Sequence, residues 1–175
     1  TGIDTWRTRD LSTIPIKYMY VDGVNFAMRN GATVDKIPML VVIGVRKDTN
    51  RKVFLALQKG DKESASSWRE VFKDMKARGL RKDIVELGIM DGLPGLMTVF
   101  EEEFSSAKIQ RCQVHVARNV LCKVSWKSRG EVTDALRDIF YAGDKAKATE
   151  AFHRFVAKYE HTQPSAVQCL SKVIE

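Results

Sequence analysis

Two aspartates could carry chemistry in this chain, because each follows an apolar, β-prone segment and is itself followed by glycine. Asp22 comes after residues 17–21, and Asp91 comes after residues 84–90. These patterns predict strands that end at the acids, where the chain turns. Carboxylate oxygens are the ligands that Mg²⁺ prefers, and shared carboxylates can hold two ions about 3.5 to 4 Å apart for phosphodiester chemistry. Because Asp-Gly is also a common turn signal, the pattern alone leaves a structural role open.

The elements predicted around these acids follow the order β-β-β-α-β-α-β. The predicted strands cover residues 17–27, 37–46, 52–58, 84–90 and 109–114, and the predicted helices cover 64–78 and 93–104. The first helix carries Trp68 on an apolar stripe with helical spacing, which predicts a core position. This order is typical of an α/β protein with a ribonuclease H-like fold, whose mixed five-stranded sheet brings the ends of the first and fourth strands together. Asp22 and Asp91 are therefore expected to be neighbours in space.

Three parts are predicted along the chain. Residues 1–16 lack a clear period and are expected to form an extended segment ahead of the first strand. Residues 17–120 contain the predicted sheet and its helices, and residues 121–175 have helical patterns that continue to the end of the sequence. The chain starts without methionine and stops within a helical pattern, so we expect it to be part of a longer protein.

The composition favours a polyanionic partner. The 175 residues include 29 basic and 22 acidic ones, for a net charge of +7. Nucleic acid is the commonest partner for such an excess, although a basic domain without such a partner is compatible with the charge. Three cysteines at irregular spacing predict reduced thiols and a cytoplasmic location. No apolar stretch reaches the roughly 20 residues of a membrane-spanning helix, so no membrane contact is expected.

A third motif makes the pattern specific. It runs through residues 111–119, with the sequence Arg-Cys-Gln-Val-His-Val-Ala-Arg-Asn, at the predicted junction between the fifth strand and the next helix. Together with Tyr-Val-Asp-Gly at 20–23 and Asp-Gly-Leu-Pro-Gly-Leu at 91–96, it resembles the Mutator-type transposases of bacterial insertion sequences. The three motifs occur in the family's order, and the resemblance covers almost the whole chain.

The resemblance implies a catalytic domain that uses an Asp-Asp-Glu triad and two Mg²⁺ or Mn²⁺ ions to cut transposon ends and join the 3′ hydroxyl to target DNA. Asp22 and Asp91 match the first two acids, as catalytic residues and metal ligands. In this family a largely helical insertion follows the fifth strand, so the resemblance implies that residues 17–120 are the catalytic core and residues 121–175 the incomplete beginning of that insertion. The third acid, a glutamate in an Asn-x-x-Glu setting beyond the insertion, has no counterpart in this chain. Glu175 is a poor substitute because residues 169–175 resemble part of the insertion, and residues 101–103, three glutamates, are interpreted as a solvated acidic face. The piece alone is predicted to be inactive.

Further residues of the motifs are candidates for DNA binding or support of the active site. The resemblance identifies Cys112 and His115 as a family signature near the active site, where His115 contacts DNA or, equally well, caps a helix or fills the core. Zinc is disfavoured because the remaining cysteines and histidines lack the spacing of a four-ligand site. The arginines that flank the motifs are suited to phosphate contacts, and they are Arg29, Arg111 and Arg118. Trp126 stands among cations and either stacks on an exposed base or is the buried aromatic of a surface linker.

The expected partners are double-stranded DNA, as transposon ends and target, and further copies of the full-length protein in a homodimer or higher oligomer. The expected location is the bacterial cytoplasm, at the nucleoid during action. Two alternatives stay open: a ribonuclease H-like nuclease that cuts without joining, and a domesticated DNA-binding protein that has lost catalysis. The motifs do not separate cut-and-paste from copy-and-paste transposition.

Overall fold

A computed structural model describes residues 2–60 and 64–174. The chain forms two compact units, one up to Gln110 and one from Arg111 onward. The first unit contains a β-sheet and the second is helical, and each is described by itself. No helix among the described residues is long and apolar enough to cross a membrane.

The sheet has five strands and confirms the predicted fold class. The strands are β1 (Ile16–Asn30), β2 (Thr33–Arg46), β3 (Lys52–Lys59), β4 (Leu87–Met90) and β5 (Lys108–Arg111). Their order across the sheet is β3-β2-β1-β4-β5, with β1 antiparallel to β2 and parallel to β4. This mixed arrangement, with the first strand beside the fourth, is the ribonuclease H-like one.

Two helices pack on one face of the sheet. They are α2 (Ala65–Ala77) and α3 (Pro94–Glu103), and the 3₁₀ turn η1 (Lys82–Ile84) precedes β4. The Ser64 side chain accepts a hydrogen bond from the Ser67 N–H and caps α2, which satisfies one of the donors left free at a helix start. The aromatic centre of this core combines residues of both helices, namely Trp68, Phe72, Phe100 and Phe104. Trp68 is fully buried, as its helical spacing predicted.

The opposite face of the sheet is shaped by a β-bulge. The register between β2 and β3 shifts after Val42, so that one residue of β3 has no partner. A strict alternation would place Leu55 and Leu57 on the same face. The bulge separates them, because Leu55 and Ala56 are both buried whereas Phe54 and Leu57 are both exposed.

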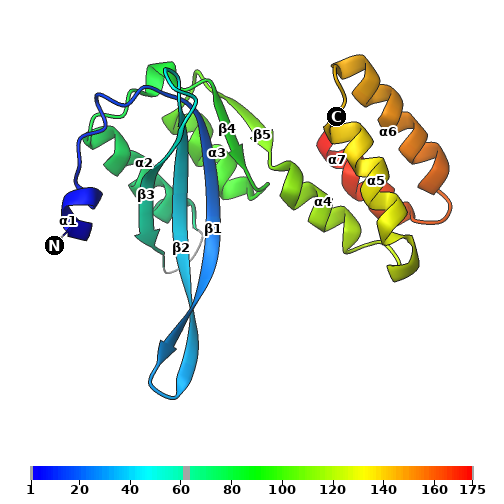
Figure 1. The fold of residues 1–175 in the computed structure, drawn as a ribbon, viewed down its shortest axis with the longest axis horizontal. Coiled ribbons are helices and arrows are strands. Elements are labelled where there is room, and N and C mark those ends of the chain that lie inside the picture. The colour runs from blue at the N-terminus through cyan, green and yellow to red at the C-terminus, as the bar shows by residue number, and fades with distance from the viewer. Residues whose placement is uncertain (1, 61–63, 175) are drawn as a thin grey trace. The chain divides into compact units, whose positions relative to one another are not determined.

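β1 and β2 are longer than the sequence predicted. They pair as far as Asn30 and Thr33 and run beyond the other strands as a two-stranded ribbon, which we define as residues 24–37 (Figure 1). The hairpin turns at Gly31, whose φ of 61° suits glycine. The expectation that the first strand ends at Asp22 is therefore wrong, because pairing with β2 carries the strand through Asp-Gly without a turn.

The segment ahead of β1 is not wholly extended, which differs from the expectation that residues 1–16 form an extended segment. Residues Gly2–Arg7 form a short helix, α1. Arg9 fastens this helix to the sheet, because its guanidinium donates hydrogen bonds to the carbonyl oxygens of Trp6 and of Phe54 in β3. The same guanidinium lies 4.6 Å from the centre of the Trp6 ring, which is within the range of a cation–π contact.

The second unit is a group of four helices. They are α4 (Gln113–Leu121), α5 (Arg129–Phe140), α6 (Lys145–Tyr159) and α7 (Pro164–Ile174), with the 3₁₀ turn η2 (Trp126–Ser128) before α5. The predicted fifth strand ends earlier than expected, because α4 already begins after Cys112. The predicted break at residues 143–144 is present, and Asp144 caps α6 by accepting a hydrogen bond of 2.8 Å from the Lys147 N–H.

Candidate active site

Asp22 lies within β1, and Asp91 is the residue that directly follows β4, the strand beside β1. The parallel register of β1 and β4 ends with Val21 opposite Met90, and each aspartate is the next residue along the chain. Neighbouring strands lie about 4.8 Å apart. The two side chains therefore start from adjacent backbone positions, although 69 residues separate them in the sequence.

Asp22 projects from the face of the sheet opposite α2 and α3. Val21 is buried in the core under these helices, and successive side chains of a strand point to opposite faces. Asp91 lies just beyond the end of β4, and both aspartates are half-buried. The Gly92 N–H donates a hydrogen bond of 2.7 Å to Oδ1 of Asp91, which orients that carboxylate at the end of β4.

The residues of the third motif lie together at the start of the second unit. Arg111 ends β5, and Cys112 is the N-cap residue of α4. His115 lies in the first turn of α4 and is half-buried, whereas Arg118 is exposed in its last turn. The structure thus places three of these four residues, Arg111, Cys112 and His115, at the start of α4 and Arg118 near its end.

A small basic pocket in the second unit was not foreseen from the sequence. It has a volume of about 290 Å³ and gathers the cations Arg111, Lys123 and Lys172, which come from the motif, the end of α4 and α7. Ser165 at the start of α7 also lines it. Only the packing of α4 against α7 joins these residues, and no local pattern could have indicated it.

Arg29 and Trp126 are both exposed. Arg29 is exposed on the ribbon, seven residues beyond Asp22, which corresponds to about 23 Å along an extended strand. It is therefore too far from Asp22 to hold the same phosphate. Trp126 is 82% exposed in η2, so the interpretation as a buried aromatic is wrong, and base stacking stays a prediction.

Comparison with known proteins identifies the family. The family model described as "Transposase, Mutator family" matches residues 1–175. The chain belongs to the Mutator family of transposases. Its relatives include the transposase for insertion sequence element IS6120 of Mycolicibacterium smegmatis, which is 35% identical over 159 residues, covering 91% of this chain and 48% of the relative. The transposase for element IS256 in transposon Tn4001 of Staphylococcus aureus is 29% identical over 170 residues, covering 97% of this chain and 43% of the relative.

Among solved structures, the Drosophila P element transposase strand transfer complex aligns with a TM-score of 0.39 and 8% identity, over 91% of this chain and 49% of that chain. In its matches to the two insertion-sequence transposases, the Mutator-family chain spans about half the length of these curated relatives.

Asp22 and Asp91 of this Mutator-family chain could together ligate a divalent cation. The two carboxylates, one on β1 and one just after β4, would provide hard oxygen ligands, and a cation held between them would offset their mutual repulsion. Within residues 2–60 and 64–174, no three histidine, cysteine, aspartate or glutamate side chains gather where they could hold a metal. Glu175 lies outside the described residues.

The run of three glutamates after Asp91 is divided by the fold of α3. Glu101 and Glu102 are exposed, as the sequence interpretation expected. Glu103 differs, because only 8% of it is exposed and it forms ion pairs with Lys76 and Arg69 of α2. The expectation of a solvated face is therefore wrong for Glu103.

Proposed function

We propose that this chain is the metal-binding part of the catalytic core of a DNA transposase, which cleaves phosphodiesters at transposon ends and joins the freed 3′ hydroxyl to target DNA. The observation that carries the proposal is that Asp22 and Asp91 each directly follow the last paired residues, Val21 and Met90, of the neighbouring strands β1 and β4. Membership of the Mutator family supports the reaction class. So do relatives that are transposases of insertion sequences.

In this proposal the two aspartates act as metal ligands. Their oxygens would hold Mg²⁺ or Mn²⁺ on the open face of the sheet, beside the hydrogen bond that orients Asp91. Such ions, when bound, activate the attacking oxygen and stabilise the leaving oxygen of the phosphodiester. Asp22 is held by the paired backbone of β1, so the rigid sheet fixes the geometry of one ligand, and the Gly92 N–H orients the other.

The third ligand of the triad is proposed to lie outside residues 1–175. The chain covers 48% and 43% of two relatives, which leaves room for a further acidic residue in the rest of the protein. We therefore expect residues 1–175 alone to be inactive in strand transfer.

Contacts with double-stranded DNA are assigned to the basic residues of both units. The net charge of +7 favours association with a polyanion. Arg29 would contact the phosphate backbone away from the scissile bond, while Arg111 and Arg118 would contact it near α4. His115 and Cys112 would support the site, with His115 contacting DNA and Cys112 packing beneath it. We place this action at the nucleoid in the bacterial cytoplasm, with the full-length protein as a homodimer or higher oligomer.

The test uses the full-length protein and isosteric changes of the two acids. Asp22→Asn and Asp91→Asn should each lower metal-dependent strand transfer by at least about 100-fold, since even indirect supports of metal sites cost 10 to 100-fold. Glu101→Gln, an exposed acid of α3, should retain activity, and circular dichroism should show that all three variants are folded.

Other outcomes would contradict the proposal. Cleavage without joining would indicate a ribonuclease H-like nuclease. DNA binding that weakens with salt but never depends on the carboxylates, with no cleavage, would indicate a domesticated DNA-binding protein.

A further inference from the structure

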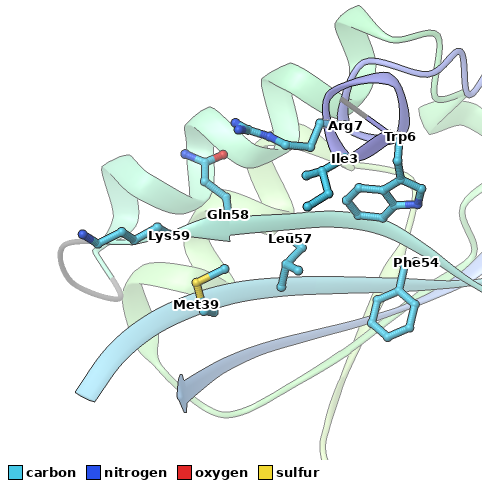
Figure 2. Close-up of a pocket in the computed structure, with 9 residues that line it drawn as sticks. Ile3, Trp6, Arg7, Met39, Phe54, Leu57, Gln58 and Lys59 are labelled. Atoms are coloured by element: carbon cyan, nitrogen blue, oxygen red, sulfur yellow. The ribbon is translucent and has the colours of Figure 1, made fainter. Parts of the chain in front are cut away.

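Pockets in the two units differ in their chemistry. In the first unit, Figure 2 shows Ile3, Trp6 and Leu57 around a pocket of about 850 Å³ whose lining is mainly apolar. The basic pocket of the second unit is smaller, and its described lining residues include three cations and no acid. A concave surface with this charge favours an anion.

The basic pocket runs between α4 and α7. Arg111 lies ahead of the start of α4, and Lys123 follows its end. Hydrogen bonds between Gln163 and Ser125 hold the start of α7 beside the residues that follow α4. Because α7 also packs against α4, it runs back along that helix. Lys172, in the last turn of α7, therefore lies toward Arg111.

The basic pocket thus offers a favourable position for an anion at each end. Arg111 and Lys172 supply two cations at one end. The other end combines Lys123 with Ser165 in the first turn of α7, where the helix dipole is positive. Ser165 and Lys172 are seven residues apart, which corresponds to about 10 Å along a helix. The neutral lining residues between the ends include the hydrogen-bond donors Asn119 and Gln168.

The lysines of the basic pocket differ from other cations of the same unit. Lys147 and Arg154 lie 3.8 and 2.6 Å from the carboxylate oxygens of Asp144 and Glu150. Within residues 2–60 and 64–174, by contrast, no acid forms an ion pair with Lys123 or Lys172. A bound anion therefore does not have to displace a carboxylate from either lysine.

The floor of the basic pocket belongs to the second hydrophobic core. Val116 is 2% exposed, and Val173 packs against the same core. The helices that carry the cations are therefore held in place before a ligand binds. Such preorganisation lowers the cost of binding.

The distance between the two ends indicates the class of anion. A single free phosphate would occupy one end and leave the other empty. A DNA strand instead carries a regular series of phosphates, one per about 3.4 Å of the duplex axis. One strand can therefore place a phosphate at each end of the basic pocket.

We propose that the basic pocket holds two phosphates of one DNA strand, one at Arg111 and Lys172 and the other at Lys123 and the start of α7. The choice of DNA as the partner rests on the proposed function. Phosphate contacts position a strand without reading its bases, so the pocket fixes the place of DNA on the second unit independently of sequence. It does so without a metal ion, because its own cations supply the charge.

The first test measures binding of the full-length protein to a transposon-end duplex in EDTA over a range of salt concentrations. Lys172→Gln should weaken binding at least about fivefold, since it removes a charge-assisted hydrogen bond. It should also reduce the slope of log affinity against log salt by about 1. Lys145→Gln, at an exposed position of α6 outside the pocket, should weaken binding by less than about twofold. Equal losses for the two variants would overturn the proposal.

A second pair of variants separates the basic pocket from the general charge of the unit. Ser165→Glu and Ala146→Glu each add one negative charge at the second residue of a helix, α7 and α6 respectively, where the helix tolerates an acid well. Ser165→Glu should weaken duplex binding at least about tenfold, because its carboxylate takes the place of a phosphate. Ala146→Glu should weaken it by less than about twofold, and similar losses for both would overturn the proposal. Circular dichroism checks folding, and Lys172→Gln keeps the test available if Ser165→Glu does not fold.

Ethylation of single phosphates in the duplex tests whether the DNA backbone is the ligand. For the wild type, ethylation of the phosphates held in the basic pocket should interfere with binding. Interference at these positions should disappear in Lys172→Gln, while the rest of the pattern stays. An unchanged pattern would overturn the proposal. If inorganic pyrophosphate binds the wild type more weakly after Lys172→Gln while that pattern stays unchanged, a small anion is the ligand.

The outcomes separate the basic pocket from the proposed function. If Asp22→Asn abolishes strand transfer while Lys172→Gln and Ser165→Glu bind the duplex like the wild type, the pocket proposal fails alone. If Asp22→Asn and Asp91→Asn retain strand transfer, the proposed function fails, whatever the pocket variants do.

Discussion

Glu103 was expected from the sequence to be a solvated acid, whereas the fold buries it and pairs it with cations of α2. Its carboxylate is buried between α2 and α3, where it pairs with Lys76 and lies 3.4 Å from Nη1 of Arg69. The hydrogen bond from Lys76, followed by the positive charges around it, holds the pKa of Glu103 below its ordinary value of 4.5. A carboxyl whose pKa is lower in the folded state stabilises the protein above its unfolded pKa and ceases to do so as the pH falls through the folded pKa.

Glu103→Gln should therefore destabilise the protein in a pH-dependent way. At pH 7 we expect the free energy of unfolding to fall by about 1 to 3 kcal/mol, because two cations lose a buried charged partner. The difference from the wild type should shrink as the pH falls below 4.5, measured by urea unfolding at several pH values. Glu101→Gln on the exposed side of α3 should change stability little at any pH, and a constant difference for Glu103→Gln would contradict this account.

The residues of the site differ in how far the sequence could indicate them. The neighbouring placement of Asp22 and Asp91 was predictable because the order of elements implies that β1 and β4 are neighbours, whereas their role as metal ligands stays a prediction. The burial of Glu103 was not predictable, since it depends on cations from another helix. The pocket around Arg111 and Lys172 likewise exists only because α4 packs against α7.

At the scale of elements, α3 packs closely against β4. A Cβ atom built on Gly88 would come within 2.4 Å of the Phe100 ring, which no real contact tolerates, and Phe100 is fully buried. Glycine at this position is what allows α3 to approach the strand that ends at Asp91.

Gly88→Ala should push α3 away from β4 and destabilise the protein by about 1 to 3 kcal/mol, as expected for overpacking of a rigid core. Chemical denaturation of the wild type and variant measures the change. Gly130→Ala in α5 is the matched control, because nothing lies within 4 Å of a Cβ there. This control should be neutral or stabilising by up to about 1 kcal/mol, since alanine favours the helix more than glycine. Equal changes in stability for Gly88→Ala and Gly130→Ala would contradict the close packing of α3 against β4.

Helices were better predicted than strands, for a physical reason. The apolar spacing of α2 is local, and the helix lies within one residue of the predicted 64–78 at each end. The length of β1 depends instead on pairing with β2, and the exposure of Leu57 depends on a bulge that β3 forms against its neighbour. The end of β5 was also missed, because residues 112–114 have a β-prone composition but begin a helix.

At the scale of the whole molecule, the described residues form two separate hydrophobic cores. One contains Phe72 under the sheet, and the other contains Phe155 among the helices from α4 onward. The chain divides into its two compact units between Gln110 and Arg111, and α4 packs against α5 and α7. The proposal that residues 17–120 act together in catalysis stays a prediction, since it concerns function and not compactness.

Separate cores should respond separately to cavities. Phe72→Ala should lower the stability of the first unit by about 3 to 5 kcal/mol, the usual cost of deleting a buried ring, and Phe155→Ala should do so for the second unit. Hydrogen exchange resolved by residue should show lost protection in β1 and α2 for the first variant and in α5 and α6 for the second. Loss of protection in both units by either change would mean that they unfold as one.

The ribbon of residues 24–37 also has a consequence for the protein's colloidal behaviour. Beyond Val21, the described strands pair β1 only with β2, and the ribbon carries the exposed apolar side chains of Phe26 and Met28. Strand edges that no further strand covers are templates for strand addition between molecules. Arg29 and Lys36 are exposed on the same hairpin, and charges at such edges disfavour this addition, so we expect solubility to depend on these cations, which lie far along the ribbon from Asp22.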